Sequence, residues 1–338
     1  MRYIGSKARI LGFISETINQ TFGPLKGAVA ADLFTGTCCV AEMFKAQGAQ
    51  VITNDYLRFS YALQVAKVKL NAEPASRILY EEALAELNAL EGIEGFFFEE
   101  YTLEGTAGAP YARNYFSSGN AKKIDAVCTC LARWRSRGDI SSDMFHLLSA
   151  SLVDTVTKVS NISGTYGAFL KIDDHRKFKP LELRPFTFAD NGFENLAYCQ
   201  DIMDLMEDVT GDLLYLDPPY NSRQYPPYYH ILETAVLYDA PPIYGLTGRR
   251  PYKDQLSPFC IKEKALPALL DVVRRARFPH VYISYSMDGI MDYQELCKGL
   301  SSMGKVQSYF KPHRRFKSNN GGEGGGPVKE IIIYVQKR

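Results

Sequence analysis

Asp217-Pro218-Pro219-Tyr220 follows a short apolar run that extends from Gly211 to Leu216. The run predicts a buried strand, so the tetrapeptide lies just past the carboxyl end of that strand. Open α/β sheets bind their ligands at this edge. The two prolines fix the backbone and remove two consecutive N–H donors. What remains is a pair of acceptors, the Asp217 carboxylate and the Pro218 carbonyl, beside the ring of Tyr220.

This arrangement suits a planar NH2 group attached to an aromatic ring. Such an amine is a poor nucleophile because its lone pair is delocalised into the ring. Two fixed acceptors, one for each N–H, can turn the nitrogen toward a tetrahedral geometry and free the lone pair for attack. Tyr220 would hold the ring by stacking, which is tolerant of base identity. The competing interpretation is a tight turn after a strand, because proline pairs commonly mark turns.

Two earlier stretches are typical of a nucleotide cofactor site. Residues 28–37 predict a strand that runs into a turn at Gly36, followed by a helix. Residues 51–55 predict a second strand that ends in Asp55, at the spacing where dinucleotide-binding folds place an acidic residue on the ribose hydroxyls. The chain has neither Gly-x-Gly-x-x-Gly nor a Walker lysine, so the turn is not built to hold a pyrophosphate.

The alternation of predicted strands and helices divides the chain. It extends over residues 1–72 and 195–338 and is lost over residues 73–194, which we interpret as an insertion or second subdomain. The alternation predicts an α/β fold with a doubly wound sheet, which ends in a hairpin of residues 306–310 against 330–335. Asp201 and Ile202 follow another short apolar stretch, where they could bind the amino group and the face of a cofactor ring.

Two segments could contact a nucleic-acid backbone. Residues 160–179 interleave small polar, aromatic and basic side chains, including Tyr166 and Lys171. Arg223 follows the tetrapeptide and is a further candidate. The connection of the terminal hairpin is basic and then glycine-rich, and a mobile basic arm would suit phosphate contact; its candidates are Arg314, Arg315 and Lys317. The competing interpretation of both segments is a solvated loop.

Composition sets limits on the function. The 338 residues allow one large domain or two modest ones, and the formal net charge of +1 restricts any nucleic-acid surface to a local patch. The seven cysteines are scattered without the spacing of a zinc site, so we expect reduced thiols and no metal centre. We recognise neither a signal peptide nor an apolar run long enough to span a bilayer, so we expect a cytoplasmic protein with no membrane partner.

In this order, the motifs resemble those of adenine-specific DNA N6-methyltransferases of the Dam-like, or D12, class, in the branch with the FokI-type modification enzymes. The family usually has Phe-x-Gly-x-Gly, and here Cys38 stands at the second glycine. The resemblance covers nearly the whole chain and is carried by Tyr3-Ile4-Gly5-Ser6-Lys7, Asp32-Leu33-Phe34-Thr35-Gly36, Asn54-Asp55, residues 164–171, Asp217-Pro218-Pro219-Tyr220-Asn221, Ser257-Pro258-Phe259-Cys260 and Ile283-Ser284-Tyr285.

The resemblance implies a seven-stranded sheet, S-adenosylmethionine as cofactor, a flipped-out adenine of double-stranded DNA as substrate, and a cognate restriction endonuclease as partner. The insertion, residues 73–194, would be the target-recognition region. The residues implied to hold the target base are Asp217, Pro218, Pro219 and Tyr220. The residues implied to hold the cofactor, from its methionine end to its adenine, are Tyr3, Lys7, Asp32, Phe34, Gly36, Asp55, Asp201 and Ile202.

Two alternatives stay open at this point. One is another amino methyltransferase, acting on cytosine N4 of DNA or on RNA. The large insertion and the N-terminal Tyr-x-Gly-Ser-Lys stretch speak against it. The other is a DNA-binding module without catalysis, for which Asp217 would be dispensable.

Overall fold

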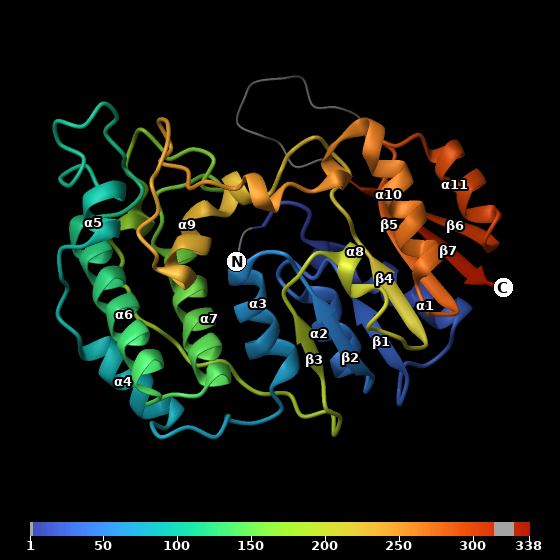
Figure 1. The fold of residues 1–338 in the computed structure, drawn as a ribbon, viewed down its shortest axis with the longest axis horizontal. Helices are drawn as coiled ribbons and strands as arrows, with labels where there is room; N and C mark the ends of the chain where they lie inside the picture. Colours follow the sequence, from blue (N-terminus) through green and yellow to red (C-terminus); the bar gives the residue numbers. More distant parts are fainter. Residues whose placement is uncertain (1–2, 314–327) are drawn as a thin grey trace.

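A seven-stranded sheet forms the centre of the molecule (Figure 1). The computed structural model describes residues 3–313 and 328–338, so the candidates Arg314, Arg315 and Lys317 lie outside the described residues. The strand order is β3-β2-β1-β4-β5-β7-β6, and β7 runs antiparallel to both its neighbours while the other pairs are parallel. The doubly wound sheet and its closing hairpin are therefore confirmed. The strands are β1 (Val29–Asp32), β2 (Gln50–Asn54), β3 (Leu196–Tyr198), β4 (Leu213–Leu216), β5 (His280–Ser286), β6 (Gly304–His313) and β7 (Val328–Lys337).

Helices cover both faces of the sheet, which explains why the central strands are apolar along their whole length. Successive residues of β4 point to opposite faces: Leu213 and Tyr215 join one buried cluster, and Leu214 and Leu216 join the other. The first face is covered by α1 (Leu11–Thr21), α2 (Cys39–Ala46) and α3 (Arg58–Gln64), and the second by α8 (Ile202–Leu205), α10 (Lys262–Arg275) and α11 (Tyr293–Ser301).

A group of helices lies beside the sheet, on the left in Figure 1. The group consists of α4 (Tyr80–Ala89), α5 (Phe96–Tyr101), α6 (Ser118–Arg137) and α7 (Ser142–Lys158), together with α9 (Pro226–Leu237), which follows β4. Helices α6 and α7 begin at Ser118 and Ser142, because the hydroxyls of the preceding residues, Ser117 and Ser141, accept hydrogen bonds from their first turns. No helix in the described part of the chain is long and apolar enough to cross a bilayer.

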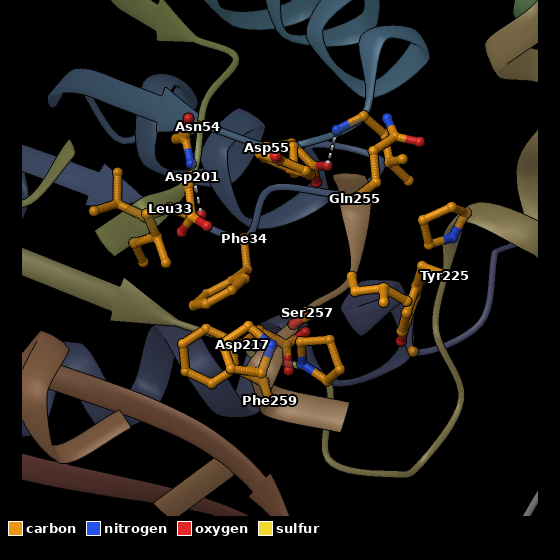
Figure 2. Close-up of a pocket in the computed structure, with 18 of the residues that line it drawn as sticks. Leu33, Phe34, Asn54, Asp55, Asp201, Asp217, Tyr225, Gln255, Ser257 and Phe259 are labelled. Atoms are coloured by element: carbon orange, nitrogen blue, oxygen red, sulfur yellow. Dashed lines mark hydrogen bonds between the residues drawn. The ribbon is translucent and has the colours of Figure 1, made fainter. Parts of the chain in front are cut away.

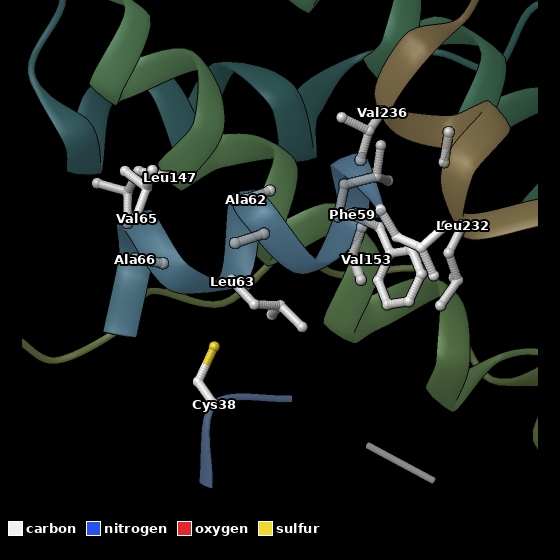
Figure 3. Packing of buried hydrophobic residues seen from close by; sticks show 14 of the residues in the cluster. Cys38, Phe59, Ala62, Leu63, Val65, Ala66, Leu147, Val153, Leu232 and Val236 are labelled. Carbon is white, nitrogen blue, oxygen red and sulfur yellow. The ribbon is translucent and has the colours of Figure 1, made fainter. Parts of the chain in front are cut away.

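Helix α3 joins the helical group to the sheet. Its apolar side chains, Phe59 among them, pack against Val153 of α7 and Leu232 of α9 (Figure 3). After Gln64, helix α3 changes into a π-helical segment, η2 (Val65–Lys69). The helical group therefore meets the sheet through α3, which begins at Arg58, shortly after Asp55 at the carboxyl end of β2.

Candidate active site

A pocket opens at the carboxyl edge of the sheet, with a volume of about 840 Å³ including its open mouth. Figure 2 shows Asp55 and Asp201 on one side of it, Asp217 on the opposite side, and Phe34 between them. Tyr3 and Ile202 also line this pocket. Residues that follow four strands, β1 to β4, and residues of the N-terminal segment therefore converge on one cavity, as expected at the switch point of a doubly wound sheet.

The carboxylate of Asp55 is held in place by backbone donors from both sides. The Gly36 N–H donates to Oδ2 at 2.8 Å, and the Leu57 N–H donates to Oδ1 at 3.0 Å. Burial raises the pKa of Asp55, and these two hydrogen bonds act in the opposite direction. Asp55 thereby ties the turn after β1 to the turn after β2, and it keeps lone pairs available to a ligand in the pocket.

Gly36 permits the N-terminal segment to lie against the turn. Its φ of 54° is left-handed, and a Cβ at this position would lie 2.9 Å from the ring of Tyr3. That ring stacks on Tyr229 at 4.6 Å between centroids, and the Ile4 N–H donates to the Tyr229 hydroxyl at 2.7 Å. Any side chain at Gly36 would therefore displace a wall of the pocket.

Cys38 adopts the backbone conformation of the glycine whose place it takes. Its φ is 70° and its ψ is 11°, in the left-handed region, where a residue with a Cβ is strained by about 1–2 kcal/mol. Its N–H donates to the Thr35 carbonyl at 2.8 Å, so the turn is closed. Figure 3 shows its sulfur pointing toward Leu63, within the buried cluster. The departure from the family pattern therefore leaves the shape of the turn intact.

We expect Cys38→Gly to change the free energy of unfolding by no more than about 1 kcal/mol, because relief of left-handed strain and loss of a buried thiol oppose each other. Cofactor affinity should stay within a few-fold. Cys38→Val should destabilise by about 2 kcal/mol or more, since a β-branched residue tolerates positive φ poorly. Thermal unfolding and calorimetry would check both variants. A large gain in affinity for Cys38→Gly would show that the cysteine distorts the turn.

Asp201 and Ile202 stand at the start of α8. The Met203 N–H donates to Oδ1 of Asp201 at 2.9 Å, so this carboxylate caps the helix while it lines the pocket. Ile202 is buried in the second cluster and presents an apolar surface to the same cavity. An acceptor next to a flat apolar wall is suited to a ring that carries an amino group.

Asp217 is paired with a buried lysine. Lys7 Nζ lies 2.9 Å from Oδ1 of Asp217, close enough for an ion pair but without the angles of a regular hydrogen bond. Burial raises the pKa of Asp217 to about 6, against the lowering effect of Lys7. Burial acts to lower the pKa of Lys7, and the charges of Asp217, Tyr220 and Glu330 outweigh it, so that this pKa is raised. Lys7 thus lies against the tetrapeptide, and it is not among the pocket-lining residues.

A family model for D12 class N6 adenine-specific DNA methyltransferases matches residues 3–295. The chain belongs to this family. Family membership agrees with the order of the motifs, with Asp217-Pro218-Pro219-Tyr220 after the fourth strand, and with the seven-stranded sheet.

Several curated relatives align with the whole chain or nearly so. The type II methyltransferase M.FokI of Planomicrobium okeanokoites is 40% identical over 344 residues, which cover 100% of this chain and 53% of M.FokI. Modification methylase StsI of Streptococcus sanguinis is 33% identical, with coverages of 100% and 52%. The type II methyltransferase M.NlaIII of Neisseria lactamica is 35% identical, with coverages of 94% and 93%. The chain thus spans about half the length of M.FokI and StsI.

S-adenosylmethionine is the methyl donor of this class, and the pocket of this D12-class chain fits it. The cofactor carries a ribose diol and an adenine amino group, both of which need acceptors, and a flat ring, which needs apolar walls. Asp55 and Asp201 supply carboxylates at one end of the pocket, and Ile202, Phe34 and Phe259 supply apolar surface. Asp217 stands at the other end, where a methyl group must meet its acceptor.

Of the other predicted cofactor residues, Asp32 lies beneath the pocket and not in its wall. It is 2% exposed, and burial raises its pKa well above the ordinary value. Pro219 lines the pocket, whereas Pro218 is buried. Tyr220 lies beside Lys7, whose ammonium is 5.2 Å from the ring centroid.

Tyr166 was predicted to contact DNA, but the structure places it in the interior. Tyr166 is 1% exposed, and its hydroxyl is within 2.9 Å of Ser160 Oγ. The ring packs near Tyr115 and His230 in the core of the helical group. A loop composition of small, aromatic and basic residues does not say which aromatic ring turns inward. Lys171 and Arg223 are exposed, so their contact with DNA stays a prediction.

The sequence analysis did not predict one wall of the pocket. Residues 255–259 line it, and none of them was among the predicted site residues. Gln224 fixes this loop through two hydrogen bonds with the backbone of Ser257, at 3.0 and 2.8 Å. Gln255 donates to the buried carboxylate of Glu233 at 3.1 Å. The Ser257-Pro258-Phe259 stretch was part of the resemblance, and it was the available signal for this wall.

Proposed function

We propose that the chain transfers a methyl group from S-adenosylmethionine to the N6 amine of an adenine in double-stranded DNA, at a short specific sequence. The observation that carries this proposal is the position of Asp217, across one pocket from the two carboxylates suited to the cofactor. The match to the D12 family supplies the class of target base.

Asp217 and the Pro218 carbonyl would each accept one N–H of the target amine, and Tyr220 would stack on the base. Both acceptors are held on a backbone that two prolines make rigid, so they cost little reorganisation when the base arrives. The base must leave the duplex stack, which costs a few kcal/mol. When bound, the cofactor supplies an electrophilic methyl group, and the nitrogen attacks it directly, without a covalent link to the protein.

For the cofactor, we propose that Asp55 binds the ribose hydroxyls and that Asp201 and Ile202 hold the adenine. Tyr3 would border the methionine end and Phe34 would form the floor, since both line the pocket. Lys7, at the methionine end, and Asp32 and Gly36, at the floor, would support these residues from behind. The hydrogen bond from the Gly36 N–H to Asp55 supports the assignment of Asp55 to the ribose, because this bond orders the turn after β1 together with the ribose acceptor.

The insertion, residues 73–194, which contains helices α4 to α7, is our proposed target-recognition region. Lys171 and Arg223 are the proposed DNA contacts among the described residues. With a net charge of +1, the molecule would bind DNA through such local groups and not through its overall charge. The names of the relatives include type II methyltransferases and modification methylases, which supports a restriction endonuclease as a functional partner. A genomic substrate also fits the cytoplasmic location predicted from the sequence.

The test is to incubate the purified chain with S-adenosylmethionine labelled in its methyl group and with phage DNA that carries no methylated bases. The DNA is then digested to nucleosides and separated. We expect the label in N6-methyl-2′-deoxyadenosine, and long-read sequencing of the same DNA should place it at one short motif. Label in N4-methylcytosine would favour the other class of amino methyltransferase. DNA without label, bound or not, would reject catalysis.

The rate of transfer should fall as the pH drops through about 6, the pKa to which burial raises Asp217. The carboxylate can accept an N–H, whereas the protonated acid presents a donor in its place. An ordinary aspartate would stay ionised to a pH of about 4. At one pH unit below the pKa, about a tenth of the molecules remain ionised, so we expect about a tenfold loss at pH 5. Single-turnover rates from pH 5 to 8 would measure it, and a rate unchanged down to pH 5 would contradict it.

A further inference from the structure

A row of buried polar groups runs beside the proposed catalytic carboxylate. Among the described residues, six buried side-chain polar atoms have no hydrogen-bond partner, and five of these six belong to this row. They are Asp32 Oδ1, Tyr215 Oη, Asp217 Oδ1, Ser284 Oγ and Glu330 Oε2. Asp217 Oδ1 has the Lys7 ammonium as an ion-pair partner at 2.9 Å, and the other four oxygens have no protein partner in hydrogen-bond geometry. Buried oxygens of the second kind are the atoms that ordered water typically binds. Their concentration at one place indicates a hydrated cluster within the protein.

The register of the sheet puts the row on one face. Asp32 pairs with Tyr215 across β1 and β4, and Tyr215 pairs with Tyr282 of β5. Two residues farther along each strand, on the same side, stand Asp217 and Ser284. The next residue on that side of β5 is Ser286, whose partner on β7 is Glu330. The row therefore crosses β1, β4, β5 and β7 in order, on the face that α1 covers.

The row holds three carboxyl groups, those of Asp32, Asp217 and Glu330, beside the ammonium of Lys7, which is 4% exposed. Lys311 of β6 stands opposite Glu330 in the register of the sheet. Burial and a nearby like charge favour the protonated form of a carboxyl group. Burial, and after it the charge of Asp217, raises the pKa of Asp32. Ser284 acts to lower the pKa of both Asp217 and Tyr215, although its oxygen makes no regular hydrogen bond to either group.

The proposed reaction releases a proton at this cluster. The lone pair of N6 forms a bond to the methyl carbon, and the electron pair of the breaking carbon–sulfur bond goes to sulfur. The nitrogen, which then carries a positive charge, must lose one of its two protons. Asp217 is the base placed beside it, and it must become a carboxylate again before the next transfer. A bound base and cofactor would fill the pocket in front of Asp217, and the buried row is then the route that leads from Asp217 into the protein.

We propose that Glu330 is a positioning residue of this reaction. Glu330 shares the Lys7 ammonium with Asp217, and it receives, through the hydrated row, the proton that the target amine loses. This inference rests on the proposed function. The proton passes from N6 to Asp217, then through water beside Ser284 to Glu330, and from there to solvent, so that charge and atoms balance. The titratable groups that act on Asp217, or that Asp217 acts on, are Lys7, Glu330, Asp32, Tyr3, Cys39, Tyr215, Tyr220 and Tyr225.

The test compares Glu330→Gln with a matched control, Glu295→Gln, in which an exposed glutamate of α11 loses the same charge. The first measurement is the titration of the Asp217 carboxyl carbon by NMR in protein labelled with ¹³C-aspartate, assigned with an Asp217→Asn sample. We expect Glu330→Gln to move the midpoint to lower pH, because a negative neighbour is lost, and the control to leave it unchanged. This measurement requires no methyl transfer.

The second measurement is the pH profile of single-turnover methyl transfer to unmethylated phage DNA. We expect Glu330→Gln to slow transfer about tenfold at neutral pH, to shift the acid limb of the profile downward, and to leave cofactor affinity within twofold. Glu330→Asp should restore part of the rate. An unchanged midpoint together with wild-type rates at every pH would overturn the proposal, and an unchanged midpoint alone would reject the shared ammonium.

Ser284→Ala provides a second variant that interrupts the row without removing a charge. It should slow transfer several-fold and move the Asp217 midpoint upward, since the hydroxyl that lowers this pKa is lost. A wild-type rate and midpoint for Ser284→Ala would count against the row as a route. If the unaltered chain transfers no methyl group, the proposed function fails, whereas the NMR midpoints still decide whether Glu330 and Asp217 share Lys7.

Discussion

Asp217→Ala is expected to reduce the rate of methyl transfer about 10³-fold while the affinity for S-adenosylmethionine stays within a few-fold. The substitution removes the charged acceptor from the nitrogen at the moment when positive charge develops on it, and loss of one such preorganised group typically costs 10²–10³ in rate. It also leaves the Lys7 ammonium buried without its partner at 2.9 Å. Single-turnover transfer and calorimetry with the cofactor would measure the two effects separately.

Loss of the Lys7 partner could also destabilise the chain, by about 3–5 kcal/mol for a buried pair. Asp217→Asn keeps the shape of the side chain and should therefore fold, with an intermediate loss of rate. Asp212→Ala is the matched control at the opposite end of the same strand, where the carboxylate accepts from the Val29 N–H at 2.8 Å. It should cost about 1 kcal/mol of stability and leave transfer unchanged. Loss of cofactor affinity in the folded Asp217 variants would contradict the assigned role.

The sheet was predictable because its signals are local. The strand before Asp217 is apolar on both faces, since helices cover both faces, and this gives a continuous hydrophobic run. The polar residues that end the strands fall at turns, so Gly36, Asp55 and Asp217 could be assigned to one edge from chain order alone. The full strand order was not predicted, because periodicity does not state which strands are neighbours.

What escaped prediction depends on contacts between distant segments. Lys7 and Asp217 form an ion pair although they are 210 positions apart in the sequence, and no local sequence pattern predicts this pair. The loop wall at residues 255–259 is fixed by Gln224, whose role is visible only in the folded chain. Glu330 lies in a hairpin that the sequence assigned correctly, yet its proximity to the active site follows from the register of β5 and β7. Tyr166 was misjudged because burial, not composition, decides which ring faces DNA.

Asp55→Ala is expected to weaken the binding of S-adenosylmethionine about 100-fold. A carboxylate that accepts from two hydroxyls contributes about 1.5–3 kcal/mol for each charged hydrogen bond, and about 1.4 kcal/mol corresponds to tenfold in affinity. The same carboxylate accepts from the Gly36 and Leu57 N–H groups, so its loss also frees the turn that carries the floor of the pocket. The effect should therefore exceed that of a residue that touches the ribose alone.

The contrast with Asp217 makes this prediction informative. Both carboxylates line one pocket and both are buried, but Asp55 should control cofactor affinity while Asp217 controls the rate of transfer. At saturating cofactor, Asp55→Ala should recover much of the single-turnover rate, whereas Asp217→Ala should not. Asp204→Ala, an exposed aspartate on α8, is the control for general loss of negative charge near the cofactor and should bind normally. If Asp55→Ala binds the cofactor as tightly as the unaltered chain, another group must hold the ribose. The assignment of cofactor affinity to Asp55 and of transfer rate to Asp217 would then be rejected.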